Sequence, residues 1–593
     1  MNLRIKKLTL IVVSISFLVN LYNIVRFPLF NNAFDPWYHS TIILEASREG
    51  AIDLNSYSGF PGLHVLPLYL SEALGLDAYH VIRWFPLFSG TLSTIIMIYF
   101  LKYLSSRMNV MKRKEIDHKS ADSMILIGSL FNTTLAVHSL ISSGMFWGQA
   151  LTASLLPLIL VKFVQVNKHP SRRIMLEYLL LVTVLFFVHH LTSFLLVTFL
   201  AFTQLYLVSR NDSSLKGFLM SFLAIMLFMV RYEVLQVDIS IINDLTWGRT
   251  NFFYLYFVIL FAGFFGLIAF RKALAKLSWG NGGINFLKSK GKLLALISLG
   301  IAMSFAFFRY ILPYLYSQFQ GLSGNWFVYY GSNLVLLAPL AIYGVIVFGN
   351  KMGGTRERIV IYLWMATILC VLVMLFAMYL LNFSLGALEF GRLSTFIYPF
   401  LSVLSGYSFL TVSTKSRIGK KMDVFLRKIS RNYRMIVKVG VIALFCVLVP
   451  FSITGFSPPP DSTLTRYYNT RSERTSMQFL GIHSHGQATL ACDYHVFEMG
   501  RYINTFYNSE YTVLSSYEYY YLDDPAHAGE LNPNNTYLIL VDEVMLEYSL
   551  SYTETDIDHK TREPLGDEIL ETYDSLVFLD KVYSSGTEWV YQA

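Results

Sequence analysis

The sequence predicts a polytopic α-helical membrane protein with a C-terminal α/β domain. Mean hydropathy is +0.47, 54% of the 593 residues are hydrophobic and only 15% are charged, a composition outside the usual range of soluble globular proteins. Apolar runs of about 20 residues, the length that crosses a bilayer, recur up to residue 454 and stop there. The chain therefore divides into a transmembrane domain, 1–454, and a soluble domain, 455–593.

The apolar runs predict about thirteen transmembrane helices. The first run is too long for a signal peptide, and no small-residue cleavage pattern follows it. The run 179–208 is too long for one helix and is interrupted only at His189-His190, so two helices are expected there. The expected spans are 8–30, 81–101, 121–141, 149–166, 174–188, 190–208, 216–231, 251–270, 293–312, 331–349, 359–381, 393–412 and 436–454.

Basic residues predict the orientation of these spans. Most of the Lys and Arg lie in alternate loops, at 102–119, 168–173, 271–292, 351–358 and 415–438, and such loops are cytoplasmic in membrane proteins. Because the number of spans is odd, we expect a cytoplasmic N-terminus and an extracytoplasmic C-terminal domain, in the plasma membrane of a prokaryote.

The net charge of +8 is unevenly distributed along the chain. Residues 455–593 carry 22 acidic and 7 basic side chains, so the positive charge belongs to membrane loops and does not indicate a nucleic-acid partner. The sequence has no Walker A motif, no dinucleotide glycine fingerprint and no H-E-x-x-H motif. ATP-driven transport and zinc proteolysis are therefore unsupported.

The soluble domain shows mixed strand and helix signals. Cys492 is its one cysteine, so a disulfide within this domain is excluded. We expect strands at 488–491, 537–541 and 575–579, a final hairpin over 581–591, and helices at 472–480 and 493–502.

The first outer loop, 31–80, begins with the most informative segment, Phe34-Asp35-Pro36-Trp37-Tyr38-His39. We expect a helix over 36–48, a turn at 59–62 and then a second short helix, which together would form a platform at the membrane surface. A carboxylate such as Asp35 in that position can deprotonate or orient a sugar hydroxyl, or hold a metal. Asp followed by Pro is also a good helix N-cap, and the two roles are compatible.

Three further candidates lie at outer membrane edges. His189 and His190 are expected to face a cavity, to bind phosphate or metal, or to be an interfacial pair. Arg392 opens a late span, and its guanidinium can bind a lipid phosphate through two hydrogen bonds. Snorkelling, or an ion pair with Glu389, is the alternative reading of Arg392.

The remaining candidates concern the substrate and a metal. The loop that contains Trp147 and Gln149 carries no carboxylate, so a metal would need histidines or an acid from another loop. A divalent metal stays an open expectation, with Asp35, His39 and His189 as tentative ligands. The candidate substrate-binding or acceptor-binding residues are Trp37, Tyr38, His64, Trp147, Gln149 and Glu389.

The order and common side of these motifs resemble the GT-C superfamily of polyprenyl-phosphate-dependent glycosyltransferases. The topology is most similar to the catalytic subunit of oligosaccharyltransferase, over essentially the whole chain. The resemblance implies a catalytic or metal-binding carboxylate at Asp35 and a lipid-phosphate contact at Arg392. In the expected reaction, His190 is a further candidate to bind the departing phosphate. Two features depart from that subunit: residues 455–593 contain no Trp-Trp-Asp-Tyr-Gly motif, and the second outer loop has Gly148-Gln149 in place of an acidic pair.

The expected function is therefore sugar transfer with inversion on the outer face of the membrane. The partners would be a polyprenyl-phosphate sugar donor, membrane lipid, and a lipid-linked glycan, protein or other cell-surface acceptor. An oligosaccharyltransferase with a divergent acceptor site is one alternative. A non-enzymatic glycan-lipid flippase or assembly subunit is another, although it would not need Asp35.

Overall fold

The computed structural model describes most of the first half of the chain and parts of the second. The described residues are 3–25, 29–30, 35–53, 61–107, 118–134, 148–209, 214–235, 390–408, and shorter segments within 341–367 and 471–592.

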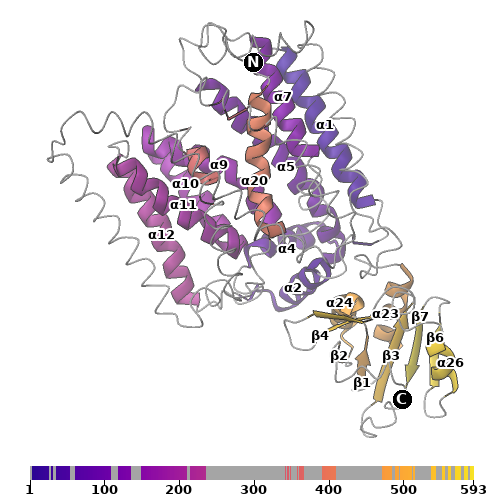
Figure 1. The fold of residues 1–593 in the computed structure, drawn as a ribbon. Helices are drawn as coiled ribbons and strands as arrows, with labels where there is room; N and C mark the ends of the chain where they lie inside the picture. Colours follow the sequence, from indigo (N-terminus) through magenta and orange to yellow (C-terminus); the bar gives the residue numbers. More distant parts are fainter. Residues whose placement is uncertain are drawn as a thin grey trace, which may run out of the picture.

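The helical region is built around α5, which packs against α1, α7 and α9. A second group, α9 to α12, packs beside it, and α20 lies against α7 (Figure 1). The helices are α1 (Leu3–Val25), α2 (Asp35–Glu49), α4 (Gly62–Leu74), α5 (Ala78–Ser106), α7 (His118–Thr134), α9 (Gly148–Lys168), α10 (Arg172–Val188), α11 (His190–Ser209), α12 (Leu215–Leu235) and α20 (Phe390–Tyr407).

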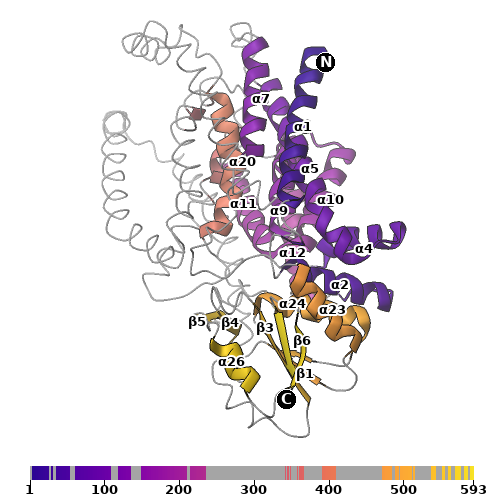
Figure 2. The same cartoon turned by 90° about the vertical axis from the view of Figure 1, so that its right-hand side faces the viewer.

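The long helices alternate in direction, so their ends gather at two opposite ends of this region. One end, which we call the joint end, holds α2, α4 and the turn between α10 and α11, and the C-terminal elements lie beside it (Figures 1 and 2). The other, the basic end, holds Arg107, Lys168, Arg172 and Lys216. The first outer loop and the C-terminal elements thus share one end, and their assignment to the outer face of the membrane stays a prediction.

The predicted division at His189-His190 is confirmed, because α10 ends at Val188 and α11 begins at His190. Among the described residues, Ala78–Ser106 and Gly148–Lys168 are long and apolar enough to cross a membrane, and Thr9–Tyr22 and His190–Gln204 are shorter apolar helices. The spans expected at 251–270, 293–312 and 436–454 lie outside the described residues, and those at 331–349 and 359–381 are described only in part. The number of spans therefore stays a prediction.

Large apolar side chains are exposed along the outward faces of the helices, for example Leu18 on α1, Leu180 on α10 and Leu219 on α12. The inward faces form one buried cluster centred on α5, α9 and α11. Exposed apolar side chains in such number are unfavourable in water and suit a lipid environment.

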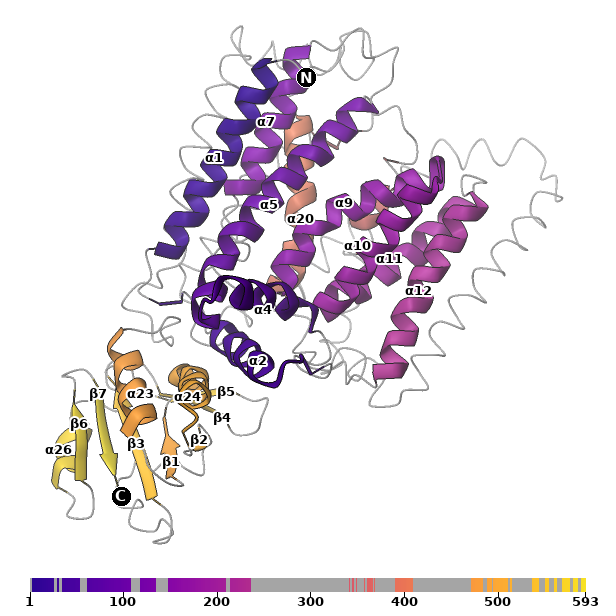
Figure 3. The same cartoon turned by 180° about the vertical axis from the view of Figure 1, so that it is seen from behind.

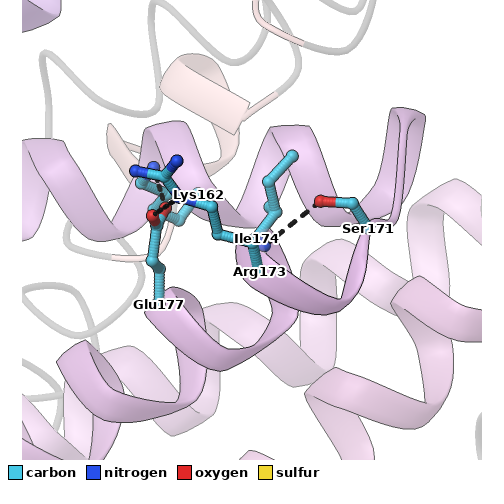
Figure 4. Close-up of polar contacts among 5 residues, drawn as sticks. All are labelled: Lys162, Ser171, Arg173, Ile174 and Glu177. Atoms are coloured by element: carbon cyan, nitrogen blue, oxygen red, sulfur yellow. Dashed lines mark hydrogen bonds and ion pairs between the residues drawn. The ribbon is translucent and has the colours of Figure 1, made fainter.

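Charged side chains near the basic end join neighbouring helices. Glu177 of α10 accepts from Lys162 of α9 at 2.5 Å and from Nε of Arg173 at 2.8 Å (Figure 4). The hydroxyl of Ser171 accepts from the backbone N–H of Ile174 at 3.3 Å and caps α10. The Lys162–Glu177 pair joins α9 to α10, whereas the other two contacts stabilise the first turns of α10.

The C-terminal unit is a five-stranded mixed sheet with strand order β2-β1-β3-β7-β6. β1 pairs in parallel with β2 and β3, whereas β7 pairs antiparallel with β3 and β6. Helices α23 and α24 share a buried core with one sheet face, and α26 reaches the other through Tyr573, which stacks on Tyr591 at 5.0 Å. The elements are α23 (Arg471–His483), β1 (Ala488–Ala491), α24 (Tyr494–Tyr507), β2 (Thr512–Leu514), β3 (Thr536–Asp542), β4 (Leu550–Thr553), β5 (His559–Arg562), α26 (Glu568–Ser575), β6 (Asp580–Ser584) and β7 (Glu588–Gln592).

Most of the elements predicted for this unit are confirmed. β1, β3, the β6–β7 hairpin and helices α23 and α24 lie where the sequence placed them. The strand predicted over 575–579 is wrong at its first residue, because Ser575 ends α26, and 576–579 lie outside the described residues. The amphipathic pattern of 568–575 favours a helix more strongly than the short apolar run after it favours a strand.

Candidate active site

The first outer loop folds as two helices that pack against each other. α2 begins at Asp35, with proline at its second position, and α4 begins at Gly62 after the turn at Pro61. A Cβ atom at Gly62 would lie 2.8 Å from the carbonyl oxygen of Phe187. Glycine therefore allows the start of α4 to approach the end of α10.

His39 of α2 and His64 of α4 join these two helices. Nδ1 of His39 lies 2.8 Å from Nε2 of His64, and both rings are fully buried. One ring must donate its N–H and the other must accept, so their tautomers are coupled. Burial lowers the pKa of His64 to about 4. Burial, with a smaller contribution from His64, lowers the pKa of His39 well below its ordinary value. The pair is therefore neutral at pH 7.

His189 forms the turn between α10 and α11. Its backbone is extended, with φ −156° and ψ 127°, and its Nδ1 accepts from the backbone N–H of Thr192 at 3.3 Å. The hydroxyl of Thr192 lies 2.7 Å from that of Thr152 on α9. The imidazole thus caps the first turn of α11 and connects, through Thr192, to α9.

His190 and Gln149 lie beside this turn. The His190 ring is half-buried and stacks on His189 with a centroid distance of 4.8 Å. Gln149 is buried in the first turn of α9. A Cβ at its neighbour Gly148 would lie 2.6 Å from the carbonyl oxygen of Val188. The structure thus brings the start of α9 against the histidine turn.

Trp37 and Tyr38 have different surroundings. Trp37 is fully buried, stacked on Tyr79 at the start of α5 and next to Tyr502 of α24. Tyr38 is half-buried, with its ring 5.7 Å from that of His39. Trp37 therefore packs between the start of α5 and the C-terminal unit, and its contact with a substrate stays a proposal.

Arg231, at the joint end of α12, is a buried cation that the sequence reasoning missed. Its side chain is 6% exposed, and its guanidinium carbon lies 4.7 Å from the centre of the Phe187 ring. Phe187 also borders Gly62, so Arg231 belongs to the same convergence of helix ends. An ionisable residue buried at the end of a membrane helix is a candidate functional residue. Its position at the end of an apolar run was the available signal.

The remaining candidates are only partly described. Asp35 opens α2, and Arg392 lies in the first turn of α20. Gly406, near the end of α20, packs on Met124 near the basic end of α7, so α20 starts toward the joint end. The side chains of Asp35 and Arg392, and Trp147 and Glu389 entirely, lie outside the described residues.

Among the residues that the structure describes, no three His, Cys, Asp or Glu side chains cluster closely enough to hold an ion, and a metal at Asp35, whose side chain lies outside them, stays a prediction. His39 binds His64, and His189 caps α11. These two imidazoles belong to different elements and have structural partners.

Comparisons with known proteins identify the fold. No protein-family model matches the sequence, and no curated protein matches it. The structure is similar to that of the Archaeoglobus fulgidus oligosaccharyltransferase tethered to an acceptor peptide with the NVT sequon, with a TM-score of 0.51 and 11% identity. That similarity covers 91% of this chain and 69% of the other.

Two further solved structures have TM-scores below 0.5. ArnT from Cupriavidus metallidurans bound to undecaprenyl phosphate gives 0.47 at 11% identity, over 99% of this chain and 97% of the other. The A. fulgidus oligosaccharyltransferase AglB with an inhibitory peptide and a dolichol-phosphate gives 0.49 at 11% identity, over 92% and 70%. The chain therefore shares its overall fold with the peptide-tethered oligosaccharyltransferase, and the resemblance seen in the sequence is confirmed at the level of fold.

Proposed function

We propose that this protein is a glycosyltransferase that moves a sugar from a polyprenyl-phosphate donor to a lipid-linked glycan, protein or other cell-surface acceptor on the outer face of the membrane. One observation carries the proposal: in a chain with the fold of an oligosaccharyltransferase, α2 and α4 lie at the joint end, between the helical region and the C-terminal unit (Figure 3). A lipid-anchored donor would reach this place from the membrane, and an acceptor would reach it from the C-terminal unit.

The reaction would proceed as a single displacement. The acceptor oxygen attacks the anomeric carbon, its proton passes to the Asp35 carboxylate, and the bond from the anomeric carbon to the phosphate oxygen breaks. The phosphate leaves with the electron pair as polyprenyl phosphate. Because the attack comes from the face opposite the leaving group, the anomeric configuration inverts.

The leaving phosphate needs cations and hydrogen-bond donors at the joint end. Arg392 and His190 are the proposed contacts, and Arg231 adds a second guanidinium at that end. A planar guanidinium can donate two parallel hydrogen bonds to a phosphate, which an ammonium cannot do in the same way.

The test uses purified full-length protein in lipid nanodiscs. The donors are total lipid-linked sugars extracted from the membranes of the cells that naturally make this protein, so the donor sugar need not be known in advance. We expect the wild-type protein, but not Asp35→Asn, to release polyprenyl phosphate together with a glycosylated acceptor. A wild-type protein that moves labelled glycan lipids across a liposome membrane and releases no polyprenyl phosphate would instead be a flippase.

Oligosaccharide transfer to asparagine is the second candidate, favoured by the fold of the peptide-tethered structure. Mass spectrometry of the product separates the two reactions. An acceptor enlarged by one sugar supports the first proposal, whereas a sequon peptide that carries the whole glycan supports the second.

A further inference from the structure

The first outer loop and the C-terminal unit share one buried cluster, which we call the joint cluster. Its buried rings are Trp37 of α2, Tyr79 at the start of α5 and Tyr502 of α24, and its other members are the half-buried Asp77 before α5 and Arg474 of α23. The rings of Trp37 and Tyr79 are stacked, with centroids 5.3 Å apart and an interplanar angle of 18°. The ring of Tyr502 lies 5.4 Å from that of Trp37, and all three are fully buried.

Polar contacts within the joint cluster hold the start of α5. The Tyr502 hydroxyl donates to Oδ1 of Asp77, and the same oxygen accepts from the backbone N–H of Tyr79 at 3.2 Å, which caps the helix. The Arg474 guanidinium lies 4.3 Å from the centre of the Tyr79 ring. Burial and the Asp77 charge raise the pKa of Tyr502 well above its ordinary value, so the hydroxyl keeps its proton and remains a donor.

Contacts with α24 restrict α2 at both of its ends. Trp37 lies in the first turn of α2, two residues after Asp35, and its ring is enclosed by Tyr79 and Tyr502. At the other end of α2, the Arg48 guanidinium donates to the carbonyl of Phe506 on α24 at 2.9 Å. A helix held at both ends by α24 has little freedom to shift its first turn relative to the C-terminal unit.

We propose that Tyr502 is a positioning residue, which fixes the first turn of α2 from the C-terminal unit and thereby places Asp35 for reaction. Catalysis would then depend on a hydroxyl that is 425 positions from its partner Asp77 in the sequence. This inference rests on the proposed transfer reaction for its kinetic consequence. Its structural consequence, a fixed start of α2, can be measured without any reaction.

The chain offers a matched control for Tyr502→Phe. Within the C-terminal unit and away from the joint, the buried Tyr591 also donates its hydroxyl to an aspartate, Asp574, at 2.9 Å. Tyr591→Phe removes the same atom and the same kind of hydrogen bond. A general loss of stability should affect both variants, whereas a loss of positioning should affect only Tyr502→Phe.

The first measurement is the labelling rate of a cysteine at position 35. Asp35→Cys is introduced into a Cys-free full-length protein, alone and with either tyrosine variant, and labelled with a maleimide. We expect the rate to change at least about threefold with Tyr502→Phe and to stay constant with Tyr591→Phe. Equal rates in all three proteins would overturn the inference, even if the protein is an active transferase.

The second measurement is transfer kinetics in the background that retains Asp35. We expect Tyr502→Phe to lower kcat by about tenfold while KM for the lipid donor changes less than about twofold. Asp77→Asn keeps an acceptor oxygen for both Tyr502 and the helix cap, so it should retain most of the activity. Losses of activity and melting temperature shared by Tyr502→Phe and Tyr591→Phe would reduce Tyr502 to a stabilising residue and refute the positioning role.

These two measurements distinguish a failure of the proposed function from a failure of the positioning role. A wild-type protein without transfer activity, combined with the predicted labelling change, would remove the proposed function and leave the joint intact. If Tyr502→Phe is not recovered as a monodisperse protein, Arg474→Gln replaces it, with the same expected labelling change and the same outcome that contradicts it.

Discussion

His39 and His64 share a buried hydrogen bond of 2.8 Å between α2 and α4, although they are 25 residues apart in the sequence. Because both imidazoles are buried and neutral, this contact between the two helices is sensitive to protons. The pair therefore predicts how the stability of the loop changes with pH.

Stability should fall as the pH is lowered from about 6.5 toward 4. The unfolded chain takes up a proton on His64 near pH 6.5, whereas the folded protein does so only near pH 4. In that window the unfolded state binds more protons, so the stabilisation is complete above about pH 6.5 and is lost as the pH falls. The lowering of the His64 pKa corresponds to a loss of roughly 3 kcal/mol in the free energy of unfolding at low pH.

Melting temperatures of the wild-type protein and His64→Gln at pH 7.5 and pH 5 measure this effect. We expect a smaller decrease in the variant, because it lacks one of the two titrating groups. His169→Gln, at an exposed histidine, should behave as wild type. Identical pH dependence in His64→Gln and wild type would contradict the prediction.

Asp35→Asn separates capping from chemistry. Asparagine caps a helix about as well as aspartate, so the start of α2 should survive. Loss of a general base typically lowers the rate by about 10² to 10⁴. We therefore expect transfer to fall at least about a hundredfold with little change in melting temperature. Asp53→Asn, at an exposed acid of the same loop, is the control and should keep wild-type kinetics. Near-normal turnover in Asp35→Asn would leave the residue as a cap only.

Arg392→Lys keeps a positive charge at the start of α20 and removes the planar guanidinium. If this residue binds the lipid phosphate through two hydrogen bonds, kcat/KM should fall by about tenfold or more, which is about 1.4 kcal/mol. Arg172→Lys, at an exposed arginine of the basic end, is the control and should leave kcat/KM unchanged. Unchanged kinetics in Arg392→Lys would favour snorkelling.

Single exposed cysteines test the orientation. Glu49→Cys on α2 and Glu571→Cys on α26 should react with an impermeant thiol reagent in intact cells. Arg172→Cys and Lys216→Cys, at the basic end, should react only after the membrane is permeabilised. The reverse pattern would place the joint end, with every proposed catalytic residue, in the cytoplasm.

Local signals in the sequence located many of the elements, although not β2, β4, β5 or α26. The paired imidazoles His189 and His190 interrupt an apolar run, which located the break between α10 and α11, and Pro36 after Asp35 located the start of α2. β1 and the β6–β7 hairpin follow from alternation and turn residues. Such signals predict elements because the length of a membrane span and the periodicity of a helix or strand both depend on residues that are neighbours in the sequence.

The tertiary structure decided which of these residues meet. The His39–His64 bond, the hydrogen bond between Thr152 and Thr192, and the Tyr502–Asp77 contact join residues separated by 25, 40 and 425 positions. Arg231 joined the site only because α12 packs beside the end of α10. Hydropathy and charge order the helices along the chain and across the membrane, but the partner of a buried polar group depends on how several helices pack, and that packing is set by the sum of many weak contacts far apart in sequence.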